Sequence, residues 1–110
     1  YLGGVIAPGI AISAEALFLR AARLPRVEVR RPSTVIGDST VGSIQSGLYW
    51  GYVGLVDGIL RRMKEELEGA HVVSTGGLAE LISPACEEID SVEKNLTLEG
   101  MRLIYGRLKK

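Results

Sequence analysis

Two short polar segments carry residue types that suit the binding of phosphate groups or small polar ligands. The first, Ser74-Thr75-Gly76-Gly77, ends a strand-like run at residues 71–75 and precedes a helical pattern at 78–82. A strand-to-helix turn points backbone N–H groups and the positive end of a helix dipole at whatever binds there, and glycine lets a ligand approach the backbone. Thr75, Gly76 and Gly77 are therefore candidates for nucleotide binding. A tight turn without a ligand would produce the same pattern.

The second segment, Gly37-Asp38-Ser39-Thr40, precedes a long run without proline. Asp38 or Ser39 suits the N-cap of a helix, because a side-chain oxygen there accepts an otherwise unpaired backbone N–H. Thr40 lies one residue further in, where the cap does not need its hydroxyl. We therefore consider two interpretations: capping alone, or capping together with a Thr40 hydroxyl that contacts a small polar ligand.

No catalytic constellation can be assembled from the remaining residues. The chain has one histidine and one cysteine, and we assemble no Ser/His/Asp or Cys/His arrangement from them. His71 opens a strand-like run without a nearby partner for base or metal chemistry, so we interpret it as structural. The cluster Glu87-Glu88-Ile89-Asp90 lacks a metal-ligand spacing, and Asp57 lies on an apolar helix where it needs a polar partner or an exit to water.

The elements that would position these segments follow from apolar spacing and from proline and glycine breaks. We expect strands at Leu2–Ala7, Val27–Val29 and 71–75, the first closed by a Pro8-Gly9 turn. We expect helices at Ala14–Arg23 with Ser13 as N-cap, at Val41–Leu67, at Leu78–Ile82, as a short turn at Pro84–Glu88, and after Thr97. Strands that alternate with helices are typical of an α/β domain, and the length suits a single domain over residues 1–110.

Four glycines recur within the long helical segment at spacings of four, three and four: Gly47, Gly51, Gly54 and Gly58. They form one stripe on an α-helix, at a cost of about 0.8–1.0 kcal/mol each relative to alanine. Close backbone approach would offset that cost, either by another helix of the same chain or by a second subunit. A membrane-helix interpretation is excluded by Gln45, Asp57 and Arg61 on the same segment.

Composition excludes several classes of protein. The hydrophobic content of 46% and formal net charge of zero exclude intrinsic disorder, and the equal basic and acidic counts create no field that would attract nucleic acid or a membrane surface. A single cysteine, Cys86, favours a reducing compartment. We therefore expect a cytoplasmic protein. Five arginines between residues 20 and 31 lack interleaved aromatic residues, so we interpret them as a solvated face.

Six segments, in this order, resemble the C-terminal half of type III pantothenate kinases, and the resemblance covers essentially all 110 residues. They are Tyr1-Leu-Gly-Gly-Val-Ile-Ala-Pro-Gly9, Ala21-Ala-Arg-Leu-Pro25, Val35-Ile-Gly-Asp-Ser-Thr40, Gln45-Ser-Gly-Leu-Tyr-Trp-Gly-Tyr52, Thr75-Gly-Gly-Leu-Ala79 and Asn95-Leu-Thr-Leu-Glu-Gly100.

The resemblance implies the C-terminal ribonuclease-H-like lobe of an actin-like ATPase or sugar kinase, with an incomplete sheet and several packed helices. Members of this family are homodimeric transferases that phosphorylate pantothenate to 4'-phosphopantothenate with ATP and Mg²⁺, in the first step of coenzyme A biosynthesis, and require K⁺ or NH₄⁺. The resemblance places Thr40 at the threonine that contacts pantothenate. It places Thr75, Gly76 and Gly77 at the adenosine side of ATP. If the chain is homodimeric like the family, the stripe of Gly47, Gly51, Gly54 and Gly58 is the interface that we expect from the glycine spacing.

Three motifs of the family precede the segment that matches Tyr1. They are a phosphate-binding Asp-x-Gly-Asn-Thr loop, a Gly-Ala-Asp-Arg segment with the catalytic aspartate, and an Asp-x-Gly-Thr-Ala-Thr loop that holds the monovalent cation. We therefore expect the chain to be one lobe of a two-lobed kinase, without a catalytic or metal-binding residue of its own and inactive alone. Ser39 departs mildly from the Asn or Asp that usually precedes this threonine.

Two alternatives stay open. One is a non-enzymatic, nucleotide-binding transcriptional accessory protein of the same superfamily, and the other is a dimerisation module for which the glycine stripe suffices. In each of these readings we expect no nucleic-acid site and no membrane segment within the chain.

Overall fold

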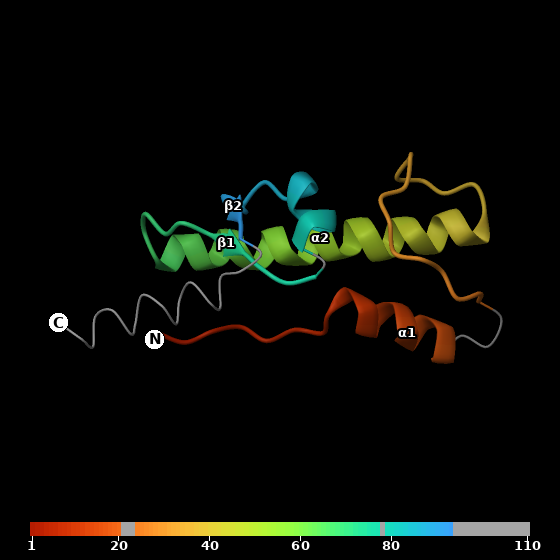
Figure 1. The fold of residues 1–110 in the computed structure, drawn as a ribbon, viewed down its shortest axis with the longest axis horizontal. Helices are drawn as coiled ribbons and strands as arrows, with labels where there is room; N and C mark the ends of the chain where they lie inside the picture. Colours follow the sequence, from red (N-terminus) through yellow and green to blue (C-terminus); the bar gives the residue numbers. More distant parts are fainter. Residues whose placement is uncertain (21–23, 78, 94–110) are drawn as a thin grey trace. The chain divides into compact units, whose positions relative to one another are not determined.

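The computed structural model describes residues 1–20, 24–77 and 79–93, which form mostly helices and a two-stranded parallel sheet (Figure 1). Its elements are α1 (Ile10–Arg20), α2 (Thr40–Glu66), β1 (Val73–Ser74), α3 (Ala79–Ile82), the 3₁₀ helix η1 (Ser83–Ala85) and β2 (Ser91–Val92). The chain divides into two compact units, Tyr1–Leu55 and a second that begins at Val56, and α2 runs through the boundary.

Helix α1 begins at Ile10, directly after the predicted Pro8-Gly9 turn. The prediction that Ser13 is the N-cap is wrong, because Ser13 lies inside the first turn. Both its backbone N–H and its hydroxyl donate to the carbonyl oxygen of Gly9, at 3.0 and 3.1 Å. A serine hydroxyl that bonds back to the carbonyl four residues earlier is compatible with a helix interior, so the helix starts earlier than predicted. The predicted last residues, 21–23, lie outside the described residues.

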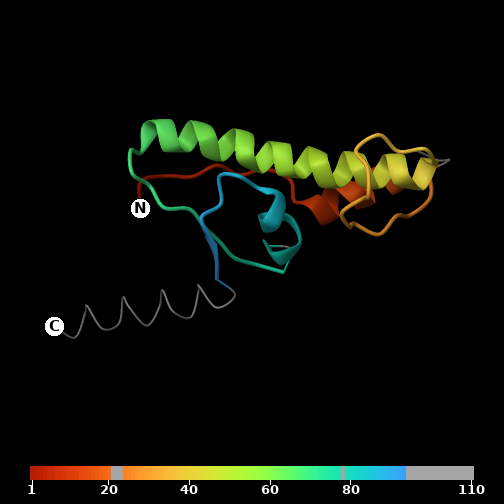
Figure 2. The ribbon, with the colours of Figure 1, turned by 90° about the horizontal axis from the view of Figure 1, so that it is seen from above.

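Helix α2 confirms the prediction of a long helix and differs from it by one residue at each end. It is 27 residues long. Figure 2 shows it as one continuous helix. Ser39 is its N-cap: the hydroxyl oxygen accepts the N–H of Gly42 at 3.0 Å, and the carbonyl oxygen accepts the N–H of Ser43. The buried residues of α2 share one side of the helix, and they are Gln45, Ser46, Leu48, Tyr49, Val53 and Asp57.

The predicted strand at Val27–Val29 is wrong, because the backbone there bonds to side chains of α2 instead of to another strand. The side-chain amide of Gln45 donates to the carbonyl oxygen of Glu28 at 3.3 Å. The hydroxyl of Ser46 donates to the carbonyl oxygen of Val35. Both donors are buried. Residues 24–39 therefore run as an irregular segment along the first half of α2.

The predicted strand at Leu2–Ala7 is also wrong for the described structure, in which residues 1–9 are irregular. Leu2 is 88% exposed and Ile6 fully exposed, so the apolar run buries little surface. A strand needs a neighbour to complete its backbone hydrogen bonds, and no strand among residues 1–20, 24–77 and 79–93 pairs with this segment.

In the second unit, β1 confirms the predicted strand at 71–75, although only two residues pair. Val73 pairs with Ser91 and Ser74 with Val92, in parallel. Helix α3 confirms the helix predicted at Leu78–Ile82, although Leu78 itself lies outside the described residues. The 3₁₀ helix η1 stands in place of the helical turn predicted at Pro84–Glu88. The helix predicted after Thr97 also lies outside the described residues.

The glycine stripe of α2 does not pack against another helix within the described residues. A Cβ atom built on Gly47, Gly51 or Gly54 would have nothing within 4 Å, and one on Gly58 would meet only the guanidinium of Arg62 at 4.0 Å. Within residues 1–20, 24–77 and 79–93, an intramolecular helix–helix contact of the stripe is therefore not observed. The stripe is open because the buried side of α2 lies elsewhere around the helix. No helix of the described residues has the length and apolar character of a membrane span.

Candidate functional site

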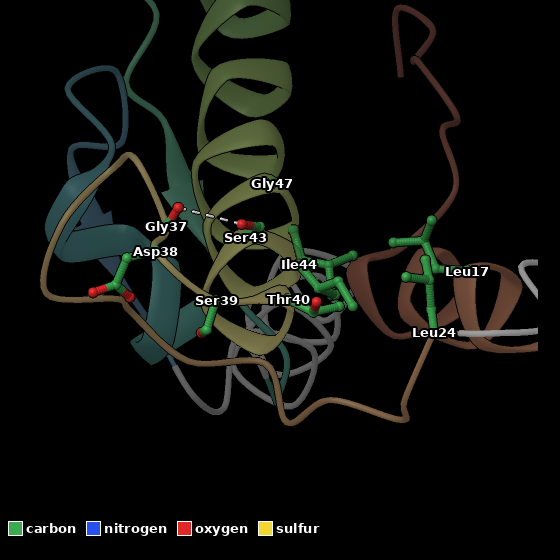
Figure 3. A pocket seen from close by; sticks show the side chains of 10 residues that line it. Leu17, Leu24, Gly37, Asp38, Ser39, Thr40, Ser43, Ile44 and Gly47 are labelled. Carbon is green, nitrogen blue, oxygen red and sulfur yellow. Dashed lines mark hydrogen bonds between the residues drawn. The ribbon is translucent and has the colours of Figure 1, made fainter.

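The start of α2 borders a cavity of about 770 Å³, shown in Figure 3. Its lining combines apolar side chains from α1, from the following segment and from α2 with the polar Gly37–Thr40 segment predicted from the sequence. The lining residues are Leu17, Leu24, Gly37, Asp38, Ser39, Thr40, Ser43, Ile44, Gly47 and Leu48. Such a cavity suits a small molecule that has both polar and apolar parts.

Three hydroxyl groups line this cavity, and two of them are engaged. The Ser39 hydroxyl caps α2, and the Ser43 hydroxyl donates to the carbonyl oxygen of Gly37 at 3.5 Å. Thr40 is exposed, and its hydroxyl makes no hydrogen bond within the described part of the chain. The Ser39 hydroxyl thus serves the helix, and the Thr40 hydroxyl is left unpaired within the described residues.

The opposite wall of the cavity is apolar. Figure 3 shows Leu17 and Leu24 beside Thr40 and Ile44, whereas Asp38 lies on the other side of the helix start. Asp38 is the one charged residue in the lining. The cavity lining between Thr40 and the two leucines is therefore a hydroxyl group set among hydrocarbon groups.

The second predicted site, Thr75-Gly76-Gly77, is an exposed turn between β1 and α3. Gly76 has a φ of +111°, a backbone conformation that residues with a side chain rarely adopt. Its carbonyl oxygen accepts the N–H of Ala79 at 3.2 Å. A Cβ atom built on Gly76 or Gly77 would have nothing within 4 Å, so the backbone of the turn is accessible. The turn belongs to the second unit, and the residues that line the cavity with Thr40 belong to the first.

A second cavity, of about 500 Å³, lies beside β2 in the second unit. Its lining comprises Glu80, Ser83, Pro84, Ile89, Asp90, Ser91 and Val92. The buried hydroxyl oxygen of Ser83 has no hydrogen-bond partner among the residues that the structure describes. Sequence analysis did not indicate this cavity, because β2 is too short to produce a recognisable pattern.

Asp57 has the polar partner that its position on an apolar helix requires. Its carboxylate is buried and accepts the backbone N–H groups of Glu87 and Glu88, each at 3.0 Å. Each carboxylate oxygen of this buried side chain therefore has one N–H donor. Asp57 therefore attaches the segment after η1 to α2.

His71 has two polar neighbours, which are compatible with the structural role expected for it. Its Nε2 lies 3.2 Å from the hydroxyl of Ser91, and its Nδ1 lies 4.0 Å from a carboxylate oxygen of Asp90. The pairing of β1 with β2 brings together residues that are 20 positions apart in the sequence. Asp90 itself accepts the N–H of Val72 at 2.7 Å, and this hydrogen bond, helped by the charge of Lys64, lowers the pKa of its carboxyl group.

Two of the five clustered arginines contact aromatic rings within the chain. Arg26 forms an ion pair with Glu15 and lies 4.1 Å above the ring centre of Phe18, and Arg31 lies 5.1 Å from that of Trp50. Their guanidinium groups thus serve intramolecular contacts.

Cys86 is a free, buried thiol. Burial, with the nearby charge of Asp57, raises its pKa to about 11. The described residues contain no group of three or more His, Cys, Asp or Glu side chains arranged to hold a metal ion.

Comparison with known proteins identifies a family. The profile of the type III pantothenate kinase family matches residues 1–62, which is more than half of the chain. The chain is 60% identical to the type III pantothenate kinase of Koribacter versatilis over 108 residues, which are 97% of this chain and 39% of that protein. It is 59% identical to that of an Exiguobacterium species over 110 residues, covering 100% of this chain and 43% of the relative.

A third relative, the type III pantothenate kinase of Geobacter sulfurreducens, is 57% identical over 108 residues, 97% of this chain and 42% of its own length. The chain thus spans about two-fifths of the length of the curated relatives that it matches. By sequence over most of its residues, the chain belongs to the type III pantothenate kinase family.

Proposed function

We propose that the chain is the C-terminal part of an ATP-dependent pantothenate kinase, which phosphorylates pantothenate to 4'-phosphopantothenate in the first step of coenzyme A biosynthesis. The observation that carries the proposal is the cavity at the start of α2, where the unpaired Thr40 hydroxyl faces apolar side chains. Pantothenate combines hydroxyl and amide groups with a branched hydrocarbon part, which matches such a lining. The kinase relatives named above support the proposal.

Thr40 is the proposed contact for pantothenate. In the full-length protein, Thr40→Ala should raise the KM for pantothenate about tenfold, the effect of one lost hydrogen bond, and leave the KM for ATP unchanged. Thr40→Ser keeps the hydroxyl and should retain most of the affinity. ADP release that depends on pantothenate measures both constants. Equal KM values for pantothenate in Thr40→Ala and the wild type would contradict this assignment.

Thr75, Gly76 and Gly77 are the proposed contacts for the adenosine side of ATP. The accessible backbone and positive φ of Gly76 fit a group that packs against a glycine turn. ATP with Mg²⁺ supplies the phosphoryl group. We assign the monovalent cation, K⁺ or NH₄⁺, mainly to parts of the full-length protein outside this chain. Gly76→Val should weaken binding of a fluorescent ATP analogue in the full-length protein, whereas Glu66→Gln, on an exposed residue remote in sequence, should not.

The chain alone should be inactive. Phosphoryl transfer needs a base that positions the substrate hydroxyl and a cradle for the γ-phosphate. We assign both to the part of the full-length kinase that precedes this lobe of the actin-like fold. Pantothenate-dependent ADP release by the 110-residue chain, clearly above that of its Thr40→Ala variant, would contradict the assignment.

A homodimer through the stripe of Gly47, Gly51, Gly54 and Gly58 completes the proposal. Three of these glycines are exposed and have open space above them, which permits close approach by a second subunit. Gly51→Leu should abolish association of the full-length protein in analytical ultracentrifugation, because leucine blocks that approach. Glu66→Leu, which adds the same side chain at the end of the helix outside the stripe, should remain dimeric. A dimeric Gly51→Leu protein would exclude this interface.

The non-enzymatic alternative has its own outcome. A full-length protein that binds ATP but neither releases ADP with pantothenate nor complements a strain without pantothenate kinase would be a regulatory relative and not the kinase.

A further inference from the structure

Three side chains on one face of α2 contact the segment between η1 and β2. Asp57, Arg61 and Lys64 follow one another at spacings of four and three residues, which places them on adjacent turns of the same face. Asp57 binds the backbone of Glu87 and Glu88, as described above. Arg61 and Lys64 both approach the carboxylate of Glu88, with closest distances of 3.7 and 3.5 Å.

Lys64 extends these contacts to the sheet. Its Nζ lies 3.4 Å from Oδ2 of Asp90, and the same oxygen accepts the N–H of Val72 at 2.7 Å. The backbone N–H groups of Asp90 and Ser91 both donate to the carbonyl oxygen of Val72, at 3.0 and 3.2 Å. A continuous chain of contacts thus leads from Lys64 on α2 through Asp90 to Val72, the residue before β1.

The strand held in this way leads directly into the glycine turn. β1 consists of Val73 and Ser74, and Thr75 follows it. Beyond the bonds to Val72, the N–H of Glu93 donates to the carbonyl oxygen of Ser74 at 2.8 Å. A two-stranded sheet of this length is marginal by itself. The position of the turn therefore depends on what holds the sheet from outside, and the Lys64–Asp90 ion pair is such an attachment.

We propose that Lys64 is a positioning residue for the nucleotide: through Asp90 and Val72 it holds β1 so that the Thr75–Gly77 turn keeps the geometry that binds the adenosine side of ATP. The inference rests on the proposed function, because it takes this turn as the ATP contact. Lys64 itself touches neither substrate.

Arg61 provides a matched control. It lies one turn before Lys64 on the same face and carries the same charge, and it pairs with Glu88. Within the described residues its one ion pair is to Glu88, so it does not connect α2 to Asp90. Removal of either charge changes the helix and the Glu88 contact similarly, but only the Lys64 substitution breaks the connection to β1.

The experiment compares Lys64→Met and Arg61→Met in the full-length protein. Lys64→Met should raise the KM for ATP about three- to fivefold, the scale of one partly exposed ion pair, with the KM for pantothenate unchanged. Arg61→Met should change neither constant, and Lys64→Arg should restore most of the ATP affinity. Hydrogen–deuterium exchange of residues 72–77 should be faster in Lys64→Met than in Arg61→Met.

The outcomes separate this inference from the proposed function. An active wild type whose KM for ATP is the same in Lys64→Met would overturn the inference and leave the function standing. Equal increases in both KM values, or equal effects of Lys64→Met and Arg61→Met, would assign Lys64 a general structural role and also overturn it. A wild type without kinase activity would overturn the proposed function and, with it, the inference.

Discussion

The backbone of Gly37 lies directly against the backbone of Ser43 in the first turn of α2. A Cβ atom on Gly37 would come within 2.7 Å of Cα of Ser43 and 2.6 Å of the carbonyl carbon of Gly42, distances that real Cβ atoms do not show. The obstacle is backbone and cannot rotate away. Glycine at this position therefore lets the polar segment before α2 fold over the start of the helix and form one wall of the cavity.

Gly37→Ala should destabilise the protein by about 1–3 kcal/mol, the usual effect of overpacking a site that cannot relax. Urea denaturation of the wild type and the variant measures the difference. Gly77→Ala, measured without nucleotide, is the control, since a Cβ atom on Gly77 would have nothing within 4 Å. Equal stabilities of Gly37→Ala and the wild type would show that the two backbones are further apart in solution.

Ser39 and Thr40 should respond differently to the same substitution. Ser39→Ala removes the N-cap hydrogen bond to Gly42 and should lower the free energy of unfolding by about 1 kcal/mol. Ser39→Asp should preserve it, because aspartate is an equally good N-cap. Thr40→Ala should leave stability within about 0.5 kcal/mol of the wild type, since its hydroxyl has no partner among the described residues. Thermal denaturation of the three variants tests whether Ser39, and not Thr40, stabilises the helix. A large loss of stability in Thr40→Ala would contradict this difference.

Asp57→Asn should destabilise the protein by about 2 kcal/mol. The asparagine side chain has one carbonyl oxygen for the two N–H groups of Glu87 and Glu88, and its own NH₂ group would face the second donor. Glu65→Gln, a charge-neutralising change on an exposed residue of the same helix, should have little effect. Comparable unfolding midpoints in urea for both variants would argue against a buried role for Asp57.

Asp90 should make stability depend on pH in the acid range. The hydrogen bond from Val72 lowers its pKa in the folded state, so the folded protein favours the ionised form more than the unfolded chain does. The stability that the ionised Asp90 contributes is therefore present above the pKa that Asp90 has in the unfolded chain. It is lost as the pH falls below about 4. The stability difference between the wild type and Asp90→Asn, measured by urea denaturation, should shrink over that range. A difference that is constant from pH 7 to pH 3 would exclude this linkage.

Cys86 should resist alkylation in the folded protein. With a pKa raised to about 11 from the ordinary 9.0, its thiolate population at pH 8 is about a hundredfold lower than in the unfolded chain, and the thiol is buried as well. Labelling by iodoacetamide should be slow in buffer and rapid in urea. Mass spectrometry measures the rate, and prompt labelling in buffer would show that the thiol is accessible.

Much of the local structure was predictable because it depends on neighbours in the sequence. The apolar spacing and the absence of proline predicted α2 almost to the residue, and the cap was placed at Asp38 or Ser39, of which Ser39 is the one observed. The strand–turn–helix pattern around Thr75 was likewise confirmed in position. The strands expected at Leu2–Ala7 and Val27–Val29 were wrong, because strand formation depends on a partner that local pattern cannot supply.

The sequence by itself determined the family, the extent of the long helix and the residue types of both candidate sites, since these are properties of composition and short-range order. Tertiary structure decided what no local pattern contains: that Leu17 and Thr40 border the same cavity, that Asp57 binds the backbone of Glu88, and that Asp90 connects Lys64 to Val72. Each of these contacts joins residues more than 15 positions apart in the chain. Contacts between residues so far apart form only when the folded unit as a whole gains enough from burial and hydrogen bonding to hold both residues in place.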